Sequence, residues 1–323
     1  MKRFIAIALM GLLAAALGGC VDPADTATDP STDNQSGAAE LSGDSTAGDN
    51  QPGDDPAEES ADVPASKITT AEELEAAFRE KNPGYQGGMQ TGPGPDGGLG
   101  VVVINDPAVR DIGPLKGLPL KGLDVSLCHI SDIDAIKGMP LAQLFLEGTA
   151  VTDISVVKGM PLETLYLGNT RVEDLSALEG MKTLKQLYLM NTKVKDLGPL
   201  KDTQLESIWL NGTPVSDIGP LKTVPLVSLT LVDTKVADLT PLEGNMTLQR
   251  LHLGTTDVTD LTPLKGLNLQ RLIITPSRIK QGLDVIREMN SLTELDVMFP
   301  RPRGQRPMPP AQFWQLHDAG QFE

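Results

Sequence analysis

The chain has 323 residues, a formal net charge of −16, a hydrophobic content of 40% and only 3% aromatic residues. A strongly acidic balance argues against a nucleic-acid-binding protein and against attachment through a basic membrane-binding patch, since both depend on positive charge. Because aromatic residues are scarce, a core large enough for this length must be built from aliphatic side chains.

Residues 1–19 have the composition expected of a signal peptide. Lys2 and Arg3 precede an apolar run of 16 residues, 4–19. This run is shorter than the roughly 20 residues needed to span a bilayer, and a basic start before a short apolar run is typical of secretion signals. We therefore expect this segment to be removed from the mature protein.

The apolar run ends in Leu17-Gly18-Gly19-Cys20, which resembles the lipobox of bacterial lipoproteins. The resemblance implies cleavage before Cys20 and acylation of this cysteine, which would anchor the chain to a membrane. The next residue is Val21 instead of Asp. In the family's sorting rule an Asp there retains the protein in the inner membrane. The resemblance thus implies a lipid-anchored cell-envelope protein, in the outer membrane or at the cell surface. An ordinary cleaved signal peptide is the alternative.

Residues 20–66 are expected to form the lipid anchor and a disordered acidic tether. The stretch 21–66 consists mainly of Asp, Pro, Ser, Thr, Gly and Ala, and it contains 12 acidic and no basic residues. Such a composition cannot bury enough apolar surface to offset the loss of conformational entropy on folding. Calcium binding by the scattered aspartates is an alternative, although the stretch lacks the D-x-D-x-D-G spacing of an EF-hand.

Residues 67–98 predict an N-terminal cap for the repeats that follow. Thr70 and Glu73 have the spacing of a capping box at the start of a helix, and apolar residues recur behind them at helical intervals. We expect this helix to end at Asn82-Pro83-Gly84. Three further elements complete this part of the chain: a strand near 85–91, a Gly- and Pro-rich turn at 92–98, and a strand near 99–104.

Ten segments within residues 99–298 fit one template, LxxLxLxxTxVxDLxPLxxxx, which restarts every 21 to 23 residues. Their leading aliphatic residues are Leu99, Leu120, Leu141, Leu162, Leu184, Leu205, Leu226, Leu248, Leu269 and Leu292. A fixed period in this range is the signature of a leucine-rich-repeat solenoid. Each copy supplies about seven aliphatic side chains that point inward, so aliphatic packing should dominate the stability of the array.

An aspartate recurs at one template position in eight copies: Asp111, Asp132, Asp153, Asp174, Asp196, Asp217, Asp238 and Asp260. A small or capping residue, often followed by proline, comes two residues later, which predicts the start of a short 3₁₀ or single-turn helix. We expect each carboxylate to accept backbone N–H groups where the chain turns. A column of metal ligands is the alternative.

The repeat pattern is similar to the 21–22-residue leucine-rich repeats of internalin-like bacterial proteins over residues 99–298. The resemblance implies an α/β solenoid, a right-handed superhelix with a parallel β-sheet on its concave face and short 3₁₀ or helical turns on its convex side. The family's Asn/Cys position is mostly Thr in this chain, and Cys128 occupies it in its own repeat. Cys128 is therefore expected to be a buried structural thiol.

The C-terminal end departs from the template. The ninth repeat breaks after Ile279, and residues 283–289 have helical spacing. Residues 299–323 form the tail, and its segment 310–322 carries three aromatic side chains, Phe313, Trp314 and Phe322. We expect this tail to fold back on the last repeat as a C-terminal cap, because a solenoid must cover its terminal core layer. A separate binding tag is the alternative.

The non-leucine positions of the strands should point outward onto the concave face. In four successive repeats the central outward position is aromatic: Phe145, Tyr166, Tyr188 and Trp209. Their surroundings are nearly uncharged, and exposed aromatic residues of this kind are typical of a protein or glycan recognition surface. A self-stacking ladder without a ligand is the alternative, because aromatic residues also pair across strands.

A modest basic spot lies further along the same face and consists of Arg250, His252 and Arg271. These residues could bind an acidic group of the ligand, and we include them among the predicted ligand-binding residues. Ordinary solvated surface is the alternative.

No catalytic, metal-binding or cofactor-binding motif occurs in the sequence. Its three histidines, His129, His252 and His317, lack the spacing of a metal site and have no evident nucleophile partner. The sequence therefore predicts a non-catalytic, monomeric cell-envelope protein that presents its concave face to a protein or polysaccharide. A structural envelope lipoprotein whose solenoid is a spacer or assembly unit is the second hypothesis.

Overall fold

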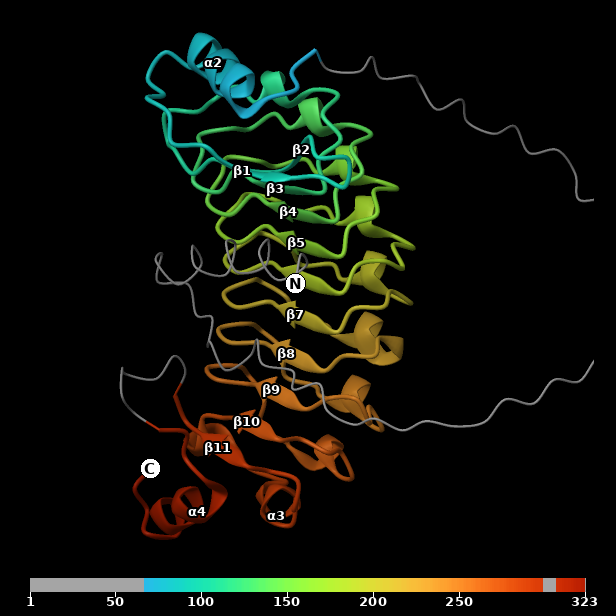
Figure 1. The fold of residues 1–323 in the computed structure, drawn as a ribbon. Coiled ribbons are helices and arrows are strands. Elements are labelled where there is room, and N and C mark those ends of the chain that lie inside the picture. Colours follow the sequence, from blue (N-terminus) through green and yellow to red (C-terminus); the bar gives the residue numbers. More distant parts are fainter. Residues whose placement is uncertain (1–66, 299–305, 323) are drawn as a thin grey trace, which may run out of the picture. The chain divides into compact units, whose positions relative to one another are not determined.

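A computed structural model describes residues 67–298 and 306–322 of the chain. The predicted signal peptide, the anchor Cys20 and the acidic tether lie outside the described residues. The described part is a stack of similar coils with helices at both ends (Figure 1). None of its helices is long and apolar enough to cross a membrane.

In the described part of the chain, eleven strands form one sheet, and their order in space follows their order in the chain. β1 pairs antiparallel with β2, and every later pair is parallel. The strands are β1 (Gln90–Pro93), β2 (Leu99–Val103), β3 (Gly122–Asp124), β4 (Gln143–Phe145), β5 (Thr164–Tyr166), β6 (Gln186–Tyr188), β7 (Ser207–Trp209), β8 (Ser228–Thr230), β9 (Arg250–His252), β10 (Arg271–Ile273) and β11 (Glu294–Asp296). From β3 onward each strand is short because the template supplies a single inward side chain between two outward ones.

Short 3₁₀ turns lie on the side of the stack opposite the strands (Figure 1). They are Gly113–Leu115, Asp134–Ile136, Ser155–Val157, Ser176–Leu178, Gly198–Leu200, Gly219–Thr223, Thr240–Leu242 and Thr262–Leu264. A further 3₁₀ turn, Pro276–Arg278, follows β10 directly. In all eight copies with the template aspartate, its Oδ1 accepts the N–H of the residue two positions later, at 2.6–2.8 Å. The structural role predicted for these aspartates is confirmed.

The core is aliphatic and continuous along the stack. In the coil that begins at Leu162, this residue, Leu165 and Leu167 are fully buried, as the template predicts. In six coils the buried template threonine donates its hydroxyl to the carbonyl oxygen three residues earlier, at 2.6–2.8 Å. Because each hydroxyl finds its partner within its own coil, threonine can occupy this position without leaving a buried polar group unpaired.

Helix α2 (Ala71–Lys81) covers the N-terminal end of the core. Both halves of the predicted capping box are present, since the Glu73 N–H donates to the Thr70 hydroxyl and the Glu73 carboxylate accepts the Thr70 N–H. Leu74 and Phe78 are fully buried. Asn82 ties the end of α2 to the first coil, because its side chain bonds the Phe78 carbonyl and the backbone of 110–111.

The strand expected near 85–91 lies later in the chain, as β1, so the predicted boundary is wrong. Tyr85 is buried beside Phe78, with ring centroids 6.2 Å apart, and its hydroxyl oxygen accepts the Met89 N–H at 3.0 Å. Gly87 and Gly88 have φ values of 107° and 106°, which a β-strand does not use. Because of this turn, the strand begins only at Gln90.

The C-terminal tail folds back on the last strand, as predicted. α3 (Leu283–Arg287) ends two residues before the expected boundary. α4 (Pro310–Asp318) packs against β11 with Phe313 fully buried, and the Leu295 N–H donates to the Met308 carbonyl at 3.0 Å. Arg287 joins the two helices, because it forms an ion pair with Asp318 and lies 4.4 Å from the ring centroid of Trp314.

Cys128 lies in the core, where the template places it. Its thiol donates to the Ile104 carbonyl at 3.1 Å, and burial raises the thiol pKa to about 11. The thiolate is the reactive form of cysteine, so this residue should be inert at neutral pH.

We expect Cys128 to resist alkylation by iodoacetamide in the folded protein and to react fully in denaturant. Quantifying the labelled peptide by mass spectrometry measures both states in one experiment. Rapid labelling of the folded chain at Cys128 would contradict the repeat register, because the register buries this position.

Candidate functional site

The side chains of β2–β11 that point away from the core form one surface, which we call the strand face. Its central column holds one residue per strand in parallel register: Val103, Asp124, Phe145, Tyr166, Tyr188, Trp209, Thr230, His252, Ile273 and Asp296. The structure therefore brings the four predicted aromatic residues together on β4–β7, each directly opposite the next.

Phe145, Tyr166, Tyr188 and Trp209 form a continuous stack, which we call the aromatic ladder. The ring centroids of Tyr166 and Tyr188 are 3.8 Å apart, with an interplanar angle of 14°. Phe145 stacks on Tyr166 at 4.6 Å, and Trp209 lies against Tyr188 at 5.3 Å. Both faces of the two tyrosine rings are thus covered by neighbours, and the ladder presents ring edges outward.

The aromatic ladder is less exposed than the sequence suggests. Three of its residues are half-buried, and Trp209 is only 8% exposed. Burial, with a further contribution from Tyr188, raises the pKa of Tyr166 far above its ordinary value. The expectation of an exposed side chain is wrong for Trp209, which lies between Tyr188 and Thr230 of the adjacent strands. The stacking proposed as the alternative is observed, and ligand binding by the ring edges stays a prediction.

A row of hydrogen-bonded polar side chains accompanies the ladder. Asn169 Nδ2 donates to Glu147 Oε1 at 3.2 Å, and Asn191 Nδ2 donates to Asn169 Oδ1 at 2.9 Å. Burial raises the pKa of Glu147, while the bond from Asn169 opposes this. The repeat pattern did not single out the asparagines, although each follows a ladder tyrosine by three residues. The row ends at the half-buried carboxylate of Glu147, beside the aromatic ladder.

Arg250, His252 and Arg271 lie on the neighbouring strands β9 and β10, but this spot is less positive than the sequence suggests. Arg271 Nε donates to Glu294 Oε2 at 2.8 Å, and Glu294 is 5% exposed. Burial lowers the pKa of His252 to about 4; the charge of Arg271 lowers this pKa further, and that of Asp233 raises it. The imidazole is therefore neutral at neutral pH. The repeat pattern did not single out Glu294 either, although the register pairs it directly with Arg271.

Comparisons with known proteins agree with this architecture. Residues 162–202 match the family model described as leucine-rich repeats in two copies. The crystal structure of internalin C2 from Listeria monocytogenes is similar with a TM-score of 0.53 and 23% identity, over 62% of this chain and 92% of that chain. This chain is a leucine-rich-repeat solenoid.

Two further solved structures resemble the solenoid with lower TM-scores. The internalin InlF from Listeria monocytogenes has a TM-score of 0.45 and 26% identity, over 58% of this chain and 70% of that chain. The plant peptide hormone receptor RGFR1, in complex with RGF2, has a TM-score of 0.45 and 14% identity, over 65% of this chain and 36% of that chain. No curated protein matches the sequence.

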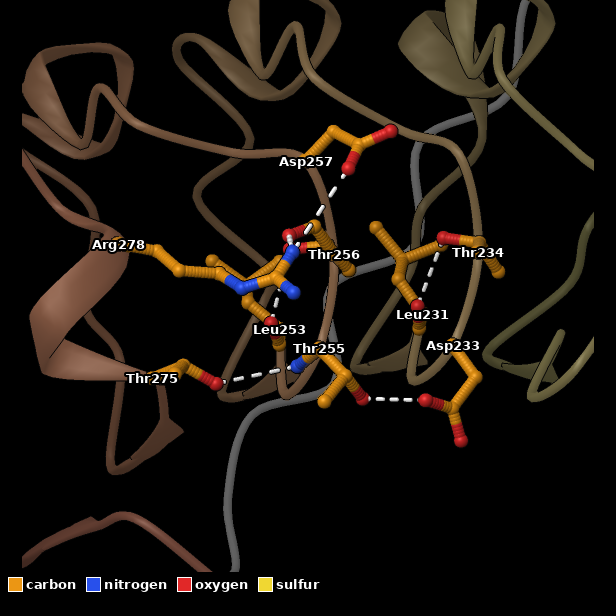
Figure 2. A network of polar contacts seen from close by, with 9 residues as sticks. All are labelled: Leu231, Asp233, Thr234, Leu253, Thr255, Thr256, Asp257, Thr275 and Arg278. Carbon is orange, nitrogen blue, oxygen red and sulfur yellow. Dashed lines mark hydrogen bonds and ion pairs between the residues drawn. The ribbon is translucent and has the colours of Figure 1, made fainter.

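Polar contacts connect three consecutive coils at the C-terminal end of the solenoid (Figure 2). The Thr255 hydroxyl donates to Asp233 Oδ1 at 2.5 Å, and the Thr255 N–H donates to the Thr275 hydroxyl at 3.1 Å. Arg278 reaches back from the following 3₁₀ turn to the Thr256 carbonyl at 2.7 Å. These contacts fix the turns that follow β8, β9 and β10, and they hold this end of the strand face in place.

Among residues 67–298 and 306–322, the solenoid contains no group of three or more His, Cys, Asp or Glu side chains that could hold a metal ion. The aspartate column, the richest source of carboxylates in the repeats, binds backbone N–H groups instead.

Proposed function

We propose that this solenoid is a non-catalytic binding protein of the cell envelope and that its aromatic ladder contacts a protein ligand. The observation that carries the proposal is the ladder itself. A chain with 3% aromatic residues places four of them in register at the centre of one face. Solenoids commonly use such extended surfaces for recognition, and Tyr and Trp are enriched among the residues that dominate binding energy.

The ring geometry favours a polypeptide over a polysaccharide. A sugar that stacks on an aromatic side chain needs an open ring face, and the faces of Tyr166 and Tyr188 are covered by their neighbours. A polypeptide can instead pack apolar side chains against the ring edges and hydrogen-bond to the polar row beside them.

A ligand selection tests this function. The chain from Val21 to Glu323, which lacks the anchor cysteine, is used to select binders from a phage-displayed library of random peptides and is also applied to a glycan array. We expect peptide binders that compete with one another for one surface and that lose affinity when the ladder is altered. Binding confined to the glycan array would contradict a protein ligand.

The spacer or assembly hypothesis is favoured by the close ring stacking, which requires no ligand. It predicts that no peptide depends on the ladder and that the chain associates with itself. Light scattering of the selected sample measures this association. A monomer that yields ladder-dependent binders would exclude the hypothesis.

The envelope location rests on Leu17-Gly18-Gly19-Cys20 at the end of the apolar run. We expect Cys20→Ala to abolish labelling by a palmitate analogue and to leave the protein uncleaved or unanchored, because acyl chains on this residue provide the membrane affinity. In-gel detection of the analogue, with Cys128→Ala as the matched control, gives the answer. Equal label in the Cys20→Ala variant and the parent would exclude the anchor.

A further inference from the structure

Building on the proposed function, we infer that the polypeptide ligand places a basic side chain, arginine or lysine, against Glu147 at the N-terminal end of the aromatic ladder. The strand face has an acidic end, an uncharged centre and a far end that carries charges of both signs. A ligand with a basic group at one end and apolar side chains behind it fits this order. The ion pair between this basic group and Glu147 would fix the direction in which the ligand runs across the strands.

The acidic end consists of Asp124 and Glu147 on either side of Phe145. Asp124 is the register partner of Phe145 on the neighbouring strand, and Glu147 follows Phe145 by two residues, which places both on the strand face. Asp124 Oδ1 accepts the Ser126 N–H at 2.9 Å, and Glu147 Oε1 accepts from Asn169. In the part of the chain that the structure describes, neither carboxylate forms an ion pair with a Lys, Arg or His.

The centre of the strand face is uncharged, and the opposite end carries charges of both signs. The outward positions flanking the centre are uncharged: Thr164, Gln186, Ser207 and Ser228 on one side, and Gly168, Met190, Asn211 and Val232 on the other. At the far end Arg271 is paired with Glu294, and His252 is neutral. Charge complementarity therefore favours a basic group at the Asp124 end over an acidic group at the Arg271 end.

Glu147 is the carboxylate best placed to make the contact. It is half-buried, and an ion pair at a partly desolvated carboxylate is stronger than one at an exposed position. The hydrocarbon stem of an arginine or lysine can lie along the ring edges of Phe145 and Tyr166 while its head reaches the carboxylate. Asp124 is 6% exposed and accepts the Ser126 N–H, so it would attract the basic group mainly by electrostatic interaction at a distance.

The test repeats the peptide selection in parallel on the chain from Val21 to Glu323, on its Glu147→Gln variant and on its Glu163→Gln variant. The Glu147→Gln change keeps an oxygen that can accept the bond from Asn169 and removes the charge. Glu163 is an exposed residue of the next coil, so its replacement is matched in chemistry and in total charge. Thermal melts of the three proteins establish that they are equally folded.

We expect peptides selected on the parent and on Glu163→Gln to share an arginine or lysine at a fixed position, and peptides selected on Glu147→Gln to lack it. Replacing that arginine by citrulline, or that lysine by norleucine, should weaken binding to the parent about tenfold or more and leave binding to Glu147→Gln unchanged. This cycle isolates the contact between the two charges.

Two failures are distinguishable. Peptides that require Tyr188 but keep the same basic residue on Glu147→Gln would overturn the inference and leave the proposed function standing. Peptides whose affinity is the same on Tyr188→Ala and Trp209→Ala as on the parent would overturn the proposed function itself.

Discussion

Leu187→Ala is expected to lower the free energy of unfolding by about 2–5 kcal/mol, the usual result of truncating a fully buried leucine. Leu187 is completely buried on β6 between Leu165 of β5 and Ile208 of β7. The cavity would lie within a stack in which each coil is supported only by its neighbours, so both interfaces of the coil lose contacts. Ile208→Ala should cost a similar amount. Denaturant unfolding followed by circular dichroism measures both.

Lys193→Ala is the matched control for Leu187→Ala. Lys193 belongs to the same coil, is exposed, and contributes its backbone N–H to the Val172 carbonyl, a bond that alanine keeps. Its replacement should change stability by less than about 0.5 kcal/mol. Equal losses at Leu187 and Lys193 would mean that the inward and outward positions of the coil are assigned wrongly.

Tyr188→Ala and Trp209→Ala are each expected to weaken a selected peptide ligand by about 2 kcal/mol or more, roughly 30-fold. They should also destabilise the fold, because each removes a stacked ring. For half-buried Tyr188 we expect a loss of about 1–2 kcal/mol. For Trp209, at 8% exposure, the loss should approach that of a core leucine. Calorimetric titration and thermal melts on the same samples measure both quantities.

A ladder that only stacks predicts a different outcome for these variants, with the same loss of stability and unchanged affinity. Tyr188→Phe separates the contributions of the ring and the hydroxyl, since it keeps the stack. Unchanged affinity in both alanine variants would move the binding site away from the ladder, towards Arg250, His252 and Arg271.

The repeat register could be predicted from sequence because each template position has one physical requirement. The leucines must be inward, the aspartates must receive backbone N–H groups at the turn, and Cys128 must tolerate complete burial. The start of β1 could not be predicted in the same way. Tyrosine is favoured in strands, but the ring of Tyr85 is buried beside Phe78. Gly87 and Gly88, which follow it, form a turn.

The sequence predicted which residues form the candidate site, but not how exposed or how charged they are. The aromatic column and the residues of the basic spot follow from counting along the template. Exposure and charge depend on neighbours in adjacent coils, so Trp209 is shielded by Tyr188, and Arg271 is neutralised by Glu294. The register itself pairs Arg271 with Glu294, so reading side chains across strands as well as along the chain would have revealed this ion pair.

The stack also gives the protein an internal optical reporter. The chain has two tryptophans, one at the end of the ladder and one in α4. With Trp314→Phe, Trp209 becomes the single tryptophan emitter, and Tyr166 and Tyr188 lie close enough to pass excitation energy to it. Its burial should place the emission at short wavelength. A ligand that binds to the ring edges would change the quantum yield or the emission wavelength of this fluorescence. Ligand binding to the strand face can therefore be followed in real time without an attached dye.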